Sequence, residues 1–203
     1  MDFKYSISNI FASVLIVCRN FIFLILAPYK TMRTISQEKD TAQLVMIFLL
    51  VLWYFLLGYR SKPLNYPAIV SYGLFVCNFI GTVWFFYILT RLLFKAGNWR
   101  SLVFTLSYTL LPTLIWFGTN SVLYILLPPP RTLSFLGRAF SIFFVSFSLS
   151  LLVWKTILVY LALRFSTGQS FVKIMYLLSL YVCIFLPYTI LLYYLKLFRV
   201  PFI

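Results

Sequence analysis

Long runs of apolar residues, separated by short polar connectors, dominate the chain from Thr41 onward. A helix needs about 20 mostly apolar residues to cross a membrane, whose hydrocarbon core is about 30 Å thick. Five runs meet or approach that length: Gln43–Tyr59, Ala68–Thr90, Leu102–Leu127, Ala139–Leu163 and Lys173–Leu195. Within a bilayer, backbone polar groups must bond to one another, so such runs fold as helices. The pattern therefore predicts an all-α, polytopic bundle of five transmembrane helices.

The N-terminal segment has a different pattern. Ile10–Ala27 is apolar enough to span a membrane, but Arg19 lies at its centre, where inserting an Arg costs roughly 2.5–3.5 kcal/mol. Several polar residues would share one narrow helical face, namely Asp2, Ser6, Asn9, Ser13 and Asn20. That face favours an interfacial helix in the headgroup region. High overall hydrophobicity favours a sixth span or a re-entrant segment instead, so both alternatives remain.

Pro28 is expected to end this first helix, because proline cannot continue a helix but suits the first turn of a new one. A basic hydrophilic connector follows, up to Asp40. We therefore expect two parts: residues 1–40, an N-terminal interfacial helix and basic connector, and residues 41–203, a five-helix transmembrane domain.

Composition and charge agree with a membrane protein. Hydrophobic residues make up 63% of the chain and charged residues only 10%, whereas a soluble domain carries more charge. The chain has 17 Lys and Arg against three acidic residues. These cations lie mainly at helix ends, where they would meet lipid phosphates. Membrane lipids are thus the predicted partners, and nucleic acid is not.

Cationic residues also predict the orientation, because cytoplasmic loops are enriched in Lys and Arg. The side that includes the N-terminal segment has ten such residues: Lys4, Arg19, Lys30, Arg33, Lys39, Arg91, Lys95, Arg100, Arg164 and Lys173. The opposite side has six: Arg60, Lys62, Arg131, Arg138, Lys196 and Arg199. We therefore expect residues 28–40 inside and the C-terminus outside.

Candidate chemistry is sparse. The acids are Asp2, Glu38 and Asp40, all outside the five runs, and the chain has no histidine. General acid–base catalysis needs such a group held in a pocket. Nucleotide-binding, zinc-protease and serine-hydrolase motifs are lacking, and the three cysteines have no metal-ligand spacing. We expect no enzyme activity, no cofactor and no metal site.

Neutral polar residues and one lysine recur at helical spacing in three of the runs, and we call them the polar seams. They are Ser71, Asn78 and Thr82 in the second run; Thr105, Thr109, Thr113 and Asn120 in the third; and Ser141, Ser148 and Lys155 in the fourth. Such residues commonly join membrane helices, so packing is the first interpretation. A polar pathway between these helices is the alternative. The first run has almost nothing polar between Leu44 and Leu57 and is expected to face lipid.

Lys155 and two prolines add detail. Lys155 precedes Arg164 by nine residues, about 13 Å along a helix, and is expected to snorkel toward the headgroups. Pro112 and Pro187 lie inside the third and fifth runs, where each removes a backbone hydrogen bond and should kink its helix. Such a kink either shapes the bundle or provides a flexing point for a gated passage.

The third run carries a family resemblance. Ser107-Tyr108-Thr109-Leu110-Leu111-Pro112 resembles the G-Y-x-L-x-P signature of the Yip1 family of five-span membrane proteins, with Tyr108, Leu110 and Pro112 matching. The proline-bearing segment that begins at Pro28 is similar to the one ahead of the first span in prokaryotic members. The resemblance implies a five-span architecture and a prokaryotic cytoplasmic membrane.

Two functional hypotheses follow. In the first, the chain is a non-enzymatic integral membrane protein of the Yip1 type, acting through contacts with lipids, with another membrane protein or with a second copy of itself. In the second, it is a small passive permease, or the membrane subunit of a transporter, that uses the polar seams as its path.

Overall fold

The computed structural model describes residues 3–38, 40–61, 67–95, 97–126 and 135–195. Within these ranges all secondary structure is helical, which confirms the predicted all-α class. The helices are α1 (Phe3–Leu26), α2 (Pro28–Ile35), α3 (Thr41–Ser61), α4 (Ala68–Phe94), α5 (Trp99–Tyr108), α6 (Leu111–Leu126), α7 (Phe135–Thr167) and α8 (Phe171–Tyr194).

Four stretches of helix are long and apolar enough to cross a membrane: Ala68–Phe94, Trp99–Leu123, Gly137–Thr167 and Phe171–Leu192. Ala12–Leu26 and Thr41–Leu57 are shorter apolar helices. These features fit the predicted membrane location. The count of five spans stays a prediction, because it depends on the stretch within α3.

The stretch formed by α5 and α6 lies at the centre of the bundle. In the most apolar part of this stretch, 72% is buried inside the protein, whereas the buried share in the other three candidate spans is 11–22%. The helix breaks at Thr109 and Leu110, whose backbone N–H groups donate to the carbonyls of Leu106 and Ser107 in tight turns. Pro112 follows this break and lacks an N–H group, so the irregularity lies where the sequence predicted a kink. By contrast, α8 continues through Pro187.

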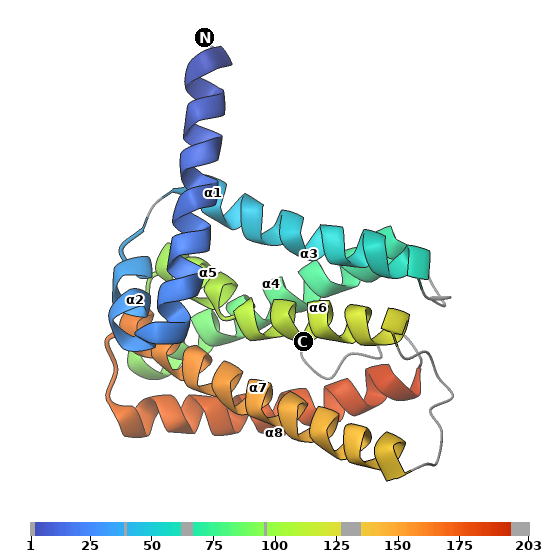
Figure 1. Cartoon of the computed structure of the whole chain (residues 1–203). Coiled ribbons are helices and arrows are strands. Elements are labelled where there is room, and N and C mark those ends of the chain that lie inside the picture. Colours follow the sequence, from blue (N-terminus) through green and yellow to red (C-terminus); the bar gives the residue numbers. More distant parts are fainter. Residues whose placement is uncertain (1–2, 39, 62–66, 96, 127–134, 196–203) are drawn as a thin grey trace.

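The N-terminal helix α1 runs across the direction of the long helices, and its first part projects beyond the bundle (Figure 1). It ends at Leu26, and Pro28 begins α2, as expected for a proline at the first helical position. The polar face of α1 does not meet headgroups or water where its side chains are described. Ser13 and Asn20 are buried against the protein, because they bond to groups of the connector and α5.

One face of α3 packs against the protein. Ile47, Val51 and Phe55 recur at helical spacing and are at most 5% exposed. Tyr54 stacks on Phe117 of α6, with ring centroids 3.9 Å apart. The expectation that this helix faces lipid therefore holds only for its other side, where residues such as Val45 and Trp53 are exposed. Nothing in the sequence distinguished the two faces, because both are apolar.

Candidate functional site

A chain of buried hydrogen bonds links the N-terminal segment to the central helix, and we call it the Tyr108 network. The hydroxyl of Tyr108 donates to Oε1 of Gln43 at 2.6 Å and accepts from Nδ2 of Asn20 at 3.2 Å. Nε2 of Gln43 donates to Oε2 of Glu38 at 3.2 Å. Tyr108 and Gln43 are completely buried, and Asn20 is 3% exposed. Three separate segments thus meet at one hydroxyl group.

The start of α3 fixes this arrangement. Asp40 caps the helix, because its Oδ1 accepts the backbone N–H of Ala42 at 3.0 Å. The other carboxylate oxygen of Asp40 accepts the hydroxyl of Ser13 at 2.8 Å. Capping sets the first turn of α3 beside α1, and this turn carries Gln43 toward Tyr108. The Tyr108 network therefore joins α1, α3 and α5 through buried hydrogen bonds.

Only parts of the Tyr108 network could be predicted from the sequence. Tyr108 belongs to the family signature, and Glu38 and Asp40 lie in the hydrophilic connector. The available signal was a lone Gln43 at the start of an apolar run, since a buried amide needs partners. The partners could not be identified without the fold, because Tyr108 is 65 residues away.

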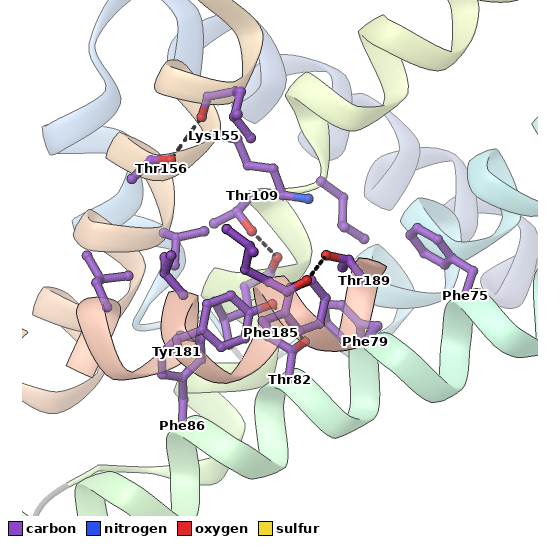
Figure 2. A pocket seen from close by; sticks show the side chains of 17 residues that line it. Phe75, Phe79, Thr82, Phe86, Thr109, Lys155, Thr156, Tyr181, Phe185 and Thr189 are labelled. Carbon is purple, nitrogen blue, oxygen red and sulfur yellow. Dashed lines mark hydrogen bonds between the residues drawn. The ribbon is translucent and has the colours of Figure 1, made fainter. Parts of the chain in front are cut away.

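A second site is a cavity of about 280 Å³ between α4, the α5–α6 junction, α7 and α8, which we call the Lys155 cavity. Phenylalanine, leucine and valine side chains supply most of its wall. Its polar lining consists of Thr82, Thr109, Lys155, Thr156, Tyr181 and Thr189. Figure 2 shows the side chain of Lys155 extending from α7 into the cavity, which Thr109 also lines. The expected snorkelling of Lys155 toward the helix end is thus wrong in this structure.

Aromatic side chains close the cavity between α4 and α8. The hydroxyl of Tyr181 lies 3.3 Å from that of Thr82, and its ring lies 4.9 Å from Phe86 and 4.7 Å from Phe185, between centroids. Such ring pairs contribute about 0.5–1.5 kcal/mol each beyond their buried area. Tyr181 therefore fills the space between two helices, and the sequence offered no polar spacing that would have marked it.

On the other side of this aromatic wall lies a second cavity of about 330 Å³. It shares Thr82, Tyr181 and Phe185 with the Lys155 cavity. Asn78 also lines it, and Oδ1 of this residue accepts the hydroxyl of Tyr188 at 2.6 Å. The two cavities are therefore neighbours that share part of their walls.

The polar seams divide between the cavities and helix packing. Thr82, Thr109 and Lys155 come together in the Lys155 cavity, and Leu110 of the family signature lines it too. Ser148 accepts the indole N–H of Trp116 at 3.1 Å and so joins α7 to α6.

The remaining seam residues do not line either cavity. Thr105 and Ser141 donate to carbonyls of their own helices. Thr113 is buried, whereas Ser71 and Asn120 are half-buried. Pro112 of the family signature is buried as well. The seams thus serve several purposes, and only part of them could form a polar path.

Comparisons of the chain with protein-family models, with curated proteins and with solved structures give no match. The resemblance to the Yip1 family therefore stays a prediction.

Proposed function

We propose that this chain is a non-enzymatic integral membrane protein that binds a lipid-like molecule in the Lys155 cavity. The observation that carries the proposal is the position of this cavity among candidate spans, with an apolar wall and one inward-directed amine. Small-molecule sites are typically such apolar hollows with a few polar groups that fix orientation. An ionisable residue within a membrane bundle is itself a sign of function.

The opening of the cavity supports a ligand that arrives through the membrane. Leu152 of α7 and Val182 and Leu186 of α8 line it, and these residues are 42–53% exposed. Because both helices are candidate spans, this exposed surface would contact acyl chains. A ligand dissolved in the bilayer could then enter between α7 and α8.

The proposed architecture has five spans and the Yip1-type layout. α3 has 21 residues and is about 32 Å long, enough to cross the hydrocarbon core. The direction of α1 across the other helices supports an interfacial helix rather than a sixth span. With residues 28–40 inside a prokaryotic cytoplasmic membrane, the C-terminus is then outside. Contact with another membrane protein, or with a second copy, is part of the same proposal.

Purification in mild detergent followed by native mass spectrometry tests lipid binding. We expect the wild-type protein to retain a membrane-derived lipid and Thr189→Trp to lose it, because the indole would occupy the cavity that Thr189 lines. Ile190→Trp is the matched control, since this neighbouring residue is 60% exposed and does not line the cavity. Equal retention by the two variants, or no lipid on the wild type, would refute the proposal.

A passive permease is the second candidate, favoured by the two cavities that share Thr82, Tyr181 and Phe185 as a common wall. Proteoliposomes that contain the protein separate the two functions. A permease should lose solute flux when Asn78, Asn120 or Lys155 is replaced by Leu in a folded protein. A binding protein should show no flux above that of empty liposomes.

A further inference from the structure

We infer that the Lys155 cavity selects a single-chain amphiphile with one anionic head group, with the head at the amine of Lys155 and the chain along the aromatic wall. This inference rests on the proposed function and defines the class of ligand. Lys155 supplies a positive charge from α7, and none of the described residues that line the cavity is acidic. The charge of Lys155 therefore favours an anion in the cavity.

The break between α5 and α6 strengthens this preference. Thr109 and Leu110, the residues at the break, line the cavity, and α6 begins at the next residue. The N-terminal end of a helix carries partial positive charge. The opposing C-terminal end of α5 is partly neutralised, because Leu106 O accepts both the backbone N–H and the hydroxyl of Thr109, at 3.1 and 2.7 Å. In other membrane proteins, broken helices direct their N-terminal ends at anionic groups.

Hydroxyl groups on the cavity walls add further hydrogen-bond donors. Thr82 and Tyr181 lie on the α4 and α8 walls and contact each other at 3.3 Å, where either oxygen can donate. A carboxylate or a phosphate accepts such bonds, whereas an amine head group would meet the like charge of Lys155. The polar lining thus discriminates between head groups by charge rather than by shape.

Size restricts the apolar part of the ligand. The cavity holds about 280 Å³, just below the roughly 300–1,000 Å³ typical of small-molecule sites. Phe75 and Phe79 extend one wall of α4 away from Tyr181, and Figure 2 shows them along one side of the cavity. This volume suits one acyl chain rather than the two chains of a phospholipid, so part of a long chain would remain between α7 and α8.

Binding measurements in nanodiscs of phosphatidylcholine test the inference. Radiolabelled oleate is the probe, and oleoyl lysophosphatidic acid and oleyl alcohol are the competitors. We expect both acids to compete at least tenfold better than the neutral alcohol of the same chain. The relative strength of the two acids then identifies a carboxylate or a phosphate as the preferred head. Equal competition by the alcohol would overturn the inference.

Substitution of Lys155 is the second test of the inference. Lys155→Met should weaken oleate binding on the order of 10- to 100-fold, as expected for a lost bond between charged groups, and Lys155→Arg should preserve it. Lys173→Met is the matched control, because it removes the same charge from an exposed position outside the cavity. Thermal unfolding of each variant shows that it is folded.

Failure of the inference is distinguishable from failure of the proposed function. If Lys155→Met binds oleate as Lys173→Met does while Thr189→Trp still loses lipid, the cavity binds a lipid but the anionic head group is wrong. If Thr189→Trp and Ile190→Trp retain lipid equally, the cavity itself is not the site.

Discussion

Among single residues, Tyr108 connects several separate segments of the described chain. Its hydroxyl joins Asn20 of α1 to Gln43 of α3, and its ring contacts Phe21 edge-on at a centroid distance of 5.6 Å. One buried side chain thus determines how the N-terminal helix meets the central helix. Phenylalanine at this position would keep the ring but lose both hydrogen bonds.

Tyr108→Phe should therefore lower the free energy of unfolding. Two buried amides would lose a partner, and leaving buried polar groups unsatisfied costs roughly 1–3 kcal/mol. Thermal unfolding in detergent measures the effect as a lower Tm. Tyr176→Phe is the control, because the Tyr176 side chain is 59% exposed on α8. Equal melting temperatures for the two variants would show that the Tyr108 network contributes nothing to stability.

Among the helices, two differ from straight, uninterrupted transmembrane helices. The central helix is divided at Thr109 and Leu110, and the break brings backbone and hydroxyl groups to the wall of the Lys155 cavity. The N-terminal helix α1 crosses the others and keeps one face buried through Val17 and Leu24, while Leu15, Ile22 and other apolar side chains are exposed. A helix in the membrane interface would place that exposed face in the acyl chains.

Cysteine labelling tests the interfacial position of α1. In a protein whose native cysteines are replaced by alanine, we expect Ser6→Cys and Gln37→Cys to react with an impermeant maleimide only after the membrane is opened. Ser61→Cys, at the other end of α3, should react in intact cells. If α1 crosses the membrane, Ser6→Cys and Gln37→Cys should instead be labelled from opposite sides.

At the scale of the whole molecule, the long helices surround one divided, buried helix and leave a cavity beside it. α5 contacts α3, α4 and α7, and α6 contacts α3 and α7. On the far side of the cavity, α8 reaches α4 through aromatic and polar side chains such as Tyr181 and Tyr188. Helices bridged by side chains in this way leave room for a ligand, whereas closely packed backbones do not.

The proposed topology predicts the location of the C-terminus. Five spans with residues 28–40 inside require it to lie outside, so alkaline phosphatase fused after Ile203 should be active in a bacterial host. The same enzyme fused after Gln169, between α7 and α8, should be inactive, because that connector is expected inside. An inactive C-terminal fusion, with activity after Gln169, would require the opposite orientation. Activity at neither or both points would require a different number of spans.

Particular residues show how far the sequence could lead. Pro112 and Pro28 marked a helix break and a helix start, because proline acts on its own backbone and needs no distant partner. Lys155 shows the opposite case, because its depth along α7 could be predicted from the spacing of residues but the direction of its amine, toward the helix end or inward, could not. Tyr181 and Gln43 owe their roles to partners on other helices, and apolar runs do not indicate which faces meet.

Local composition and length are enough to predict the helical class, the approximate extent of most apolar helices and the suitability of four of them for a membrane. Three features became evident from the fold alone: the polar face of α1 turns inward, Tyr108 joins three segments, and Lys155 lines a cavity. Contacts of this kind join residues far apart in the chain, and apolar helices have many faces on which they could pack.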